Sequence, residues 1–358
     1  MEDLQKIRLL DLDREELAAF VSSLNMPRYR ASQIYGRILA GDDIPKITSL
    51  SKKDREVLSQ AAVSGLPEIV SVRQSKLDET AKYLFRVSGG VLVETVLMKY
   101  SYGYSVCVSS QAGCRMGCRF CASSGIAFSR DLSPGEILGQ IIAVNKDKNI
   151  RIGHVVIMGI GEPLDNYDNV IKFLKLVTSE DGLNISARKI SLSTCGIVPN
   201  IIKLAGEGIP VTLSVSLHNP FDNERSEIMP VNRLYPLDEL FKACREYVRL
   251  TGRRVTFEYS LISGVNDSAR HANELAVRLS HLQCHVNIIP VNKVTGTGFE
   301  RPDREAINRF AKMLEEKGIP ATVRRELGRD ISAACGQLRK SVITEQSADR
   351  SLSVDKES

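Results

Sequence analysis

The sequence predicts an α/β fold in which a small helical domain and a β-hairpin precede a sheet of parallel strands. After residue 103, short apolar runs alternate six times with helical patterns, which is typical of parallel strands joined by right-handed crossovers. The chain has 358 residues, of which 43% are hydrophobic and 25% charged. That length and composition suit one large globular domain with accessory parts.

Residues 1–62 are predicted to form the helical domain. Three segments place apolar residues at helical spacing: 14–23, 31–40 and 52–62. Pro27 separates the first two, and Ser51 is a suitable N-cap for the third.

Basic and aromatic residues alternate between the first and second of these helices. Such a mixture can hold phosphates and stack on bases, and it comprises Arg28, Tyr29, Arg30, Gln33 and Tyr35. A solvated helix face with Tyr35 in the core explains the same pattern equally well. The net charge of +5 is compatible with RNA or DNA binding but does not establish it.

Residues 63–102 are predicted to be a hairpin connector. The segments 82–87 and 91–98 alternate apolar and polar residues with period two and are separated by Ser88-Gly89-Gly90. We expect this hairpin to bridge the helical domain and the main domain and to line the site.

Residues 103–330 are predicted to hold the parallel strands. The strand-like runs cover 105–108, 154–158, 189–193, 211–217, 255–261 and 285–290, with a further short run at 321–324. Helical patterns follow them, beginning near residues 133, 166, 197, 236, 267 and 302.

Three cysteines follow the first of these strands in a C-x-x-x-C-x-x-C pattern: Cys114, Cys118 and Cys121. Closely spaced thiolates can hold three irons of a cubane cluster and leave the fourth open to a ligand. The alternative is a structural zinc site that adds Cys107. Eight cysteines, no apolar run long enough to span a membrane and no signal-peptide pattern indicate a reducing, cytoplasmic location.

Small hydrogen-bonding residues follow several of the other strands, where parallel α/β folds gather their chemistry. These segments are 158–163 (Met-Gly-Ile-Gly-Glu-Pro), 193–196, 214–220 and 290–292. The two glycines of the first permit a turn where backbone approaches a ligand, and Glu162 can accept from an ammonium. Each alone could be ordinary turn chemistry. Together around a cysteine triplet they indicate a ligand site.

The end of the chain holds one more cysteine, Cys335, in a loop of small residues predicted at 331–340. Beyond it, residues 341–358 are polar and predict a disordered tail.

Several of these segments together resemble the RlmN/Cfr family of radical S-adenosylmethionine (SAM) RNA methyltransferases. The resemblance covers about residues 20–340 and rests on the three cysteines, 158–163, 216–218, 225–232, 236–237, 264–267 and 333–338. Residues 285–292 are more similar to the RlmN branch, although Ile160 and Cys195 replace its commoner Met and Ser. The resemblance implies a partial (β/α)6 TIM-like barrel.

The resemblance also implies roles for single residues. Cys114, Cys118 and Cys121 would bind one [4Fe-4S] cluster, and Cys335, Cys107 and Glu94 would be catalytic. The SAM contacts carried over are Gly161 and Glu162 for its amino end, Ser193, Ser216, Leu217 and His218 for ribose and backbone, and Asn292 for adenine.

The implied reaction consumes two SAM molecules and methylates C2 of adenosine 2503 in 23S rRNA, and in some members adenosine 37 of tRNAs. Cys335 would carry the methyl group, Glu94 would accept a proton, and Cys107 would release the product by forming a disulfide with Cys335. Glu94 as an exposed hairpin residue and Cys107 as a core residue are the plainer interpretations. An electron donor such as flavodoxin or ferredoxin and a monomeric enzyme are expected.

Two rival functions fit parts of the sequence. A Cfr-type enzyme would methylate C8 of the same adenosine. A zinc-stabilised RNA-binding protein would use the same cysteines without catalysis.

Overall fold

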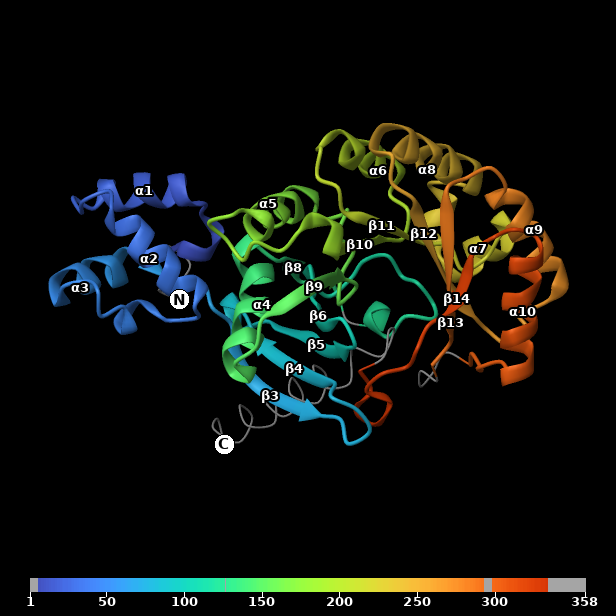
Figure 1. The fold of residues 1–358 in the computed structure, drawn as a ribbon, viewed down its shortest axis with the longest axis horizontal. Helices are drawn as coiled ribbons and strands as arrows, with labels where there is room; N and C mark the ends of the chain where they lie inside the picture. The colour runs from blue at the N-terminus through green and yellow to red at the C-terminus, as the bar shows by residue number, and fades with distance from the viewer. Residues whose placement is uncertain (1–5, 126, 293–297, 334–358) are drawn as a thin grey trace, which may run out of the picture.

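A ten-stranded sheet runs through the part of the chain that the computed structural model describes, residues 6–125, 127–292 and 298–333 (Figure 1). Its strand order is β14-β13-β12-β11-β10-β9-β6-β5-β4-β3. Neighbours from β6 to β14 are parallel, whereas β3, β4 and β5 extend the sheet in antiparallel pairs. Strands β3 and β14 form the two edges, so the barrel is open.

The parallel strands lie within two residues of their predicted positions. They are β6 (Gly103–Cys107), β9 (Ile152–Ile157), β10 (Ile190–Thr194), β11 (Thr212–Ser216), β12 (Val255–Leu261), β13 (Cys284–Pro290) and β14 (Ala321–Val323). The predicted hairpin is also present, as β4 (Ala81–Arg86) and β5 (Leu92–Tyr100), with β3 (Glu68–Gln74) beside it.

Six helices connect the parallel strands and begin close to the predicted residues. They are α4 (Pro134–Lys148), α5 (Tyr167–Thr178), α6 (Val198–Gly206), α8 (Leu237–Thr251), α9 (Ala269–Leu279) and α10 (Arg304–Glu316). A short helix that the sequence pattern did not predict, α7 (Asp222–Ile228), follows β11. Among the described residues, no helix has the length and hydrophobicity needed to cross a membrane.

The two faces of the parallel strands differ in chemistry. On β12, Phe257 and Tyr259 belong to the large apolar core, while Glu258 and Ser260 line a cavity on the other face. Parallel sheets covered by helices on both faces are usually apolar on both. Here the face that lines the cavity is polar. The alternation of polar and apolar residues along β12 therefore indicates on which side of the sheet a ligand can bind.

The helical domain consists of α1 (Arg14–Ser23), α2 (Arg30–Leu39) and α3 (Lys52–Ala61). As predicted, the Ser51 hydroxyl caps α3 by accepting from the Asp54 N–H. The strands β1 (Ile7–Arg8) and β2 (Ala62–Val63) close the domain as a parallel pair. Gly135 of α4 packs closely on the segment that precedes α1. A Cβ added to Gly135 would lie 2.6 Å from the Leu10 backbone.

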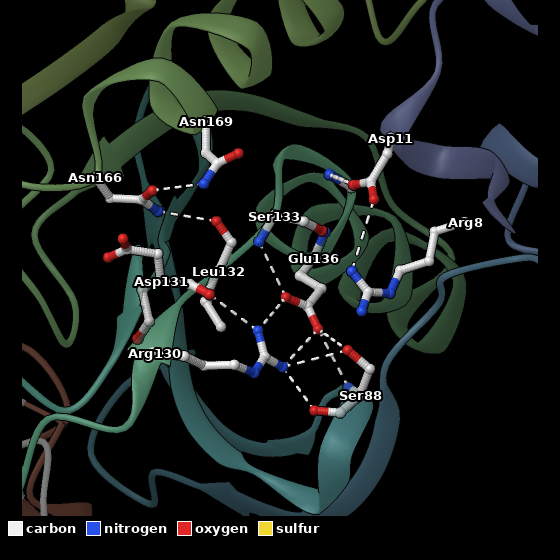
Figure 2. A network of polar contacts seen from close by, with 12 residues as sticks. Arg8, Asp11, Ser88, Arg130, Asp131, Leu132, Ser133, Glu136, Asn166 and Asn169 are labelled. Atoms are coloured by element: carbon white, nitrogen blue, oxygen red, sulfur yellow. Dashed lines mark hydrogen bonds and ion pairs between the residues drawn. The ribbon is translucent and has the colours of Figure 1, made fainter. Parts of the chain in front are cut away.

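A buried carboxylate, Glu136, joins the hairpin turn to the start of α4 (Figure 2). It accepts two hydrogen bonds from the Arg130 guanidinium, others from Ser88, and one from the Ser133 N–H. Burial favours a raised pKa for Glu136, but these hydrogen bonds outweigh it and lower the pKa. Glu136 is therefore an ionised, fully occupied structural group.

Candidate active site

The carboxyl ends of the parallel strands surround one cavity. It is lined by the cysteine loop 114–121, by the turn 158–163 after β9 and by residues at the ends of β10, β11, β12 and β13. The structure thus brings together the four strand-end segments that the sequence singled out. Of the SAM contacts predicted there, Gly161, Glu162, Ser193, Ser216, His218 and Asn292 line this cavity.

Leu217 differs from the other predicted SAM contacts. Its side chain is fully buried in the large apolar core, on the opposite face from Ser216. Its backbone carbonyl accepts from the Arg225 guanidinium, and its N–H donates to the Glu258 carbonyl. Any contact between Leu217 and a ligand in the cavity would have to involve its backbone.

The three cysteines of the loop, Cys114, Cys118 and Cys121, line the same cavity. Gly117 has a φ of +70°, a conformation that glycine adopts without strain and that lets the chain turn between the first two cysteines. The Arg119 N–H donates to the Ile228 carbonyl at the end of α7, which fixes the loop over the sheet. Burial raises the pKa of Cys114 to about 11 and raises that of Cys118 further.

Three thiols on one cavity are the donor set that an iron–sulfur cluster requires. In the described part of the chain, no group of three or more His, Cys, Asp or Glu side chains is arranged to hold a metal ion. In a cubane cluster each thiolate binds a different iron, so the three thiols need not converge on one ion. Cys107, the fourth ligand of the zinc alternative, lines a different cavity.

Glu162 connects the turn after β9 to the end of β10. Its carboxylate accepts from the backbone N–H groups of Leu164 (3.0 Å) and Cys195 (2.7 Å). Burial raises its pKa, an effect that the Cys195 N–H opposes. Among the described residues, no cation forms an ion pair with Glu162, and its side chain lines the cavity, where its oxygens can accept from an ammonium group.

The two glycines of this turn have a packing role that the sequence analysis interpreted differently. An added Cβ at Gly159 would lie 2.6 Å from the Val108 carbonyl oxygen, and one at Gly161 would lie 2.6 Å from the Gln111 Cβ. The glycines therefore allow the turn to approach the segment after β6. This packing alone accounts for glycine at positions 159 and 161, without the predicted approach of a ligand to the backbone.

His218 is a neutral, immobilised side chain in the cavity wall. Burial, with a smaller contribution from the Arg225 charge, lowers its pKa to about 3. Its Nδ1 accepts from the Ser260 N–H at 2.8 Å, which leaves the ring hydrogen on Nε2. Its ring packs edge-on against Phe120 of the cysteine loop, with 4.4 Å between centroids.

A buried arginine, to which the sequence pattern assigned no role although it begins the segment 225–232, organises this end of the sheet. Arg225 of α7 is fully buried and donates to the carbonyls of Cys195, Ser216 and Leu217 and to the Asn232 side chain. Burial lowers its pKa to about 10, so it keeps its charge at neutral pH. Asn232 belongs to the same segment 225–232, but the other acceptors are backbone carbonyls, which carry no side-chain signature.

We expect Arg225→Met to destabilise the fold by about 3 kcal/mol or more, because each buried acceptor left without a donor costs about 1–3 kcal/mol. Urea unfolding measures the change. Arg249→Met on α8 is the control, since Arg249 forms an exposed pair with Glu246 and should change stability little. Equal effects of the two substitutions would contradict the organising role of Arg225.

A second cavity adjoins the first and shares four lining residues with it: Met158, Ile289, Asn292 and Arg324. Cys107 lines this second cavity together with Val96, Leu327 and Ala333. Cys335 and the rest of its predicted loop from residue 334, as well as the predicted tail, lie outside the described residues. Ala333, two residues before Cys335, belongs to the same apolar cluster as Cys107 and lines the same cavity.

Glu94, the predicted proton acceptor, is not an exposed hairpin residue. It is fully buried on β5, and its backbone carbonyl accepts from the Ser109 hydroxyl at 2.6 Å. Its neighbour on the same face of β5, Val96, pairs with Cys107 across the β5–β6 ladder. Glu94 and Cys107 therefore project from the same face of adjacent strands.

The basic and aromatic residues of the helical domain are divided between surface and core. Tyr29 is 61% exposed with the Arg30 guanidinium over its ring, whereas Tyr35 is 5% exposed and belongs to the core. The core interpretation is thus correct for Tyr35. Arg28 and Tyr29 remain candidates for RNA contact.

Two family models match the chain. Residues 108–275 match the model described as the radical SAM superfamily. Residues 7–63 match the model of the ribosomal RNA large subunit methyltransferase N-terminal domain.

Relatives are similar along nearly the whole chain. A probable dual-specificity RNA methyltransferase RlmN from Desulforamulus reducens is 48% identical over 337 residues, covering 94% of this chain and 96% of the relative. Its counterpart from Pelotomaculum thermopropionicum is 49% identical over 341 residues, covering 94% and 92%.

A solved structure has the same fold. The crystal structure of a radical SAM methyltransferase from Sphaerobacter thermophilus superimposes with a TM-score of 0.90 at 45% identity, covering 93% of this chain and 99% of the other. Similarity over this length includes both the helical domain and the sheet that carries the cysteine loop. The chain therefore belongs to the RlmN family of radical SAM RNA methyltransferases, whose superfamily uses a [4Fe-4S] cluster and SAM.

Proposed function

We propose that this enzyme methylates C2 of adenosine in RNA, with adenosine 2503 of 23S rRNA and adenosine 37 of tRNAs as targets. The observation that carries the proposal is the pair of adjoining cavities, one lined by the three loop cysteines and the other by Cys107. The relatives are named as dual-specificity RNA methyltransferases, which supports two kinds of RNA substrate.

The first cavity is the proposed cofactor site. Cys114, Cys118 and Cys121 would hold one [4Fe-4S] cluster, and the buried Glu162 carboxylate would face the amino group of SAM. When bound, cluster and SAM supply the organic radical that activates a methyl group for bonding to an electron-poor aromatic carbon. The neutral ring of His218 and the hydroxyls of Ser193 and Ser216 can orient the ribose through hydrogen bonds, and Asn292 can contact adenine.

The second cavity is the proposed place of methyl transfer. The Cys335 thiolate would take a methyl group from one SAM and, after activation, carry it to C2, which joins protein and RNA covalently. Glu94 would accept the proton from C2. The Cys107 thiolate would then attack the Cys335 sulfur and break its bond to the methylene carbon, which keeps the bonding pair and takes up a proton to become the methyl group of the released RNA. The disulfide that remains must be reopened by an external reductant.

The partners follow from this chemistry. Arg28 and Tyr29 would contact RNA, with the target adenosine turned out of its stack into the cavity. We also propose a monomeric enzyme of the cytoplasm, where ribosomal RNA is found, served by a flavodoxin or ferredoxin as electron donor.

The test is mass spectrometry of nucleosides after anaerobic incubation of the enzyme with SAM, reductant and unmethylated 23S rRNA. We expect 2-methyladenosine. 8-Methyladenosine would assign the enzyme to Cfr-type chemistry, and no methylated nucleoside from cluster-loaded protein would overturn the proposed substrate.

A further inference from the structure

A lysine and a glutamate face each other inside the hairpin, away from solvent. The side chain of Lys82 on β4 is 2% exposed, that of Glu94 on β5 is 0% exposed, and Nζ lies 3.4 Å from Oε1. Burying two charges is costly, and a well-packed apolar pair is often at least as stable. The pair therefore calls for a reason beyond stability.

The Glu94 carboxylate differs from the other buried carboxylates in its hydrogen bonding. Neither of its oxygens accepts a hydrogen bond from any described residue. By contrast, Glu136 accepts several (Figure 2), Glu162 accepts two backbone N–H groups, and Glu258 accepts from Asn287. Glu94 thus has a counter-charge, but its lone pairs remain available to take up a proton.

Lys82 also reaches the segment that leads to Cys335. Its Nζ donates to the backbone carbonyl of Ser332 at 3.3 Å. Ala333, the next residue, packs in the same apolar cluster as Cys107. One ammonium group therefore contacts both Glu94 and the chain three residues before Cys335.

We propose that Lys82 is a positioning residue that pairs with the Glu94 carboxylate and holds it beside Ser332, three residues before Cys335. The inference rests on the proposed function, in which Glu94 is the proton acceptor. An isolated carboxylate in an apolar interior is costly, and an opposite charge beside it offsets that cost. Lys82 supplies this charge and fixes the position of the carboxylate.

In the step that Lys82 serves, the C2–H bond of the protein–RNA adduct breaks, and the proton moves to a Glu94 oxygen. The bonding pair stays in the adenine ring, whose unpaired electron passes to a one-electron acceptor of the iron–sulfur class. Glu94 becomes neutral and Lys82 keeps its charge.

The experiment compares Lys82→Met, Glu94→Gln and the double variant in the full-length, cluster-loaded enzyme. Single-turnover formation of methylated RNA should fall about 100-fold in each, at the lower end of what a positioned acid or base contributes. The double variant should be no slower than Glu94→Gln, because Lys82 acts through Glu94. Formation of 5′-deoxyadenosine from SAM should persist. Lys99→Met is the matched control, since Lys99 forms an exposed pair with Glu79 on the same hairpin.

RNA deuterated at adenine C2 separates a proton-transfer defect from a packing defect. Lys82→Met should show a larger isotope effect than the wild type, whereas Lys99→Met should not. Lys82→Arg, which keeps the charge, should recover part of the rate. The melting temperatures of the wild type, the two single variants and the double variant measure the coupling between Lys82 and Glu94 independently of any activity assay.

Three outcomes overturn the inference: an unchanged isotope effect in Lys82→Met, a further loss when Lys82→Met is added to Glu94→Gln, or independent effects on melting temperature. If Lys82→Met does not fold, two single-turnover rates test the inference instead. They are the rate of the double variant relative to Glu94→Gln and the rate of Lys82→Arg relative to the wild type. Failure of the proposed function is distinct, because the wild type itself would then form no 2-methyladenosine.

Discussion

Cys118→Ala should abolish both iron–sulfur cluster binding and cleavage of SAM. Cys118 lies in the middle of the loop, and its thiol lines the cavity together with those of Cys114 and Cys121. Two remaining thiolates cannot hold the three irons that a site-differentiated cubane needs. Iron content, visible absorbance after anaerobic reconstitution and 5′-deoxyadenosine formation measure the loss.

Cys244→Ala is the control for that experiment. Cys244 is a fully buried thiol in α8 whose pKa burial raises to about 12, and it belongs to the large apolar core. Its replacement should leave the iron content unchanged. Iron and SAM cleavage retained in Cys118→Ala would refute the cluster assignment, and zinc in place of iron in the wild type would favour the structural-metal alternative.

The order of strands and helices could be predicted because it depends on local patterns. Period-two alternation located β12, and a serine before Pro134 located the start of α4, where the Ser133 side chain does accept from the Glu136 N–H. The same alternation also places Leu217 on the opposite face from Ser216. Applied to single residues, it would have shown that the Leu217 side chain belongs to the core.

The groups that hold the site together could not be predicted in the same way. Arg225 donates to backbone carbonyls at the ends of two neighbouring strands, and Lys82 contacts the carbonyl of a residue 250 positions later. Such contacts depend on how distant segments pack, and the acceptors carry no side-chain signature. A charged residue within the strand pattern of β12, Glu258, was a weak indication of a polar face. Its partner Asn287 comes from the next strand and could not be inferred from that pattern.

Cys107→Ala should stop the reaction after one turnover, with RNA covalently attached to the protein. Cys107 lines the second cavity beside Ala333, two residues before Cys335, which is where a thiolate that attacks Cys335 must lie. Without that thiolate nothing cleaves the bond between the Cys335 sulfur and the methylene carbon joined to RNA. The measurement is denaturing electrophoresis with labelled RNA, together with mass spectrometry of the cross-linked peptide.

Cys284→Ala is the matched control for Cys107→Ala, because Cys284 is a buried thiol on β13 that lines neither cavity. It should turn over and leave no covalent species. Cys107 packs in one apolar cluster with Val96 and Leu327, as a core residue would. The adduct separates the two roles: normal turnover by Cys107→Ala would make Cys107 a core residue, whereas accumulation of the adduct requires its thiolate in the release step.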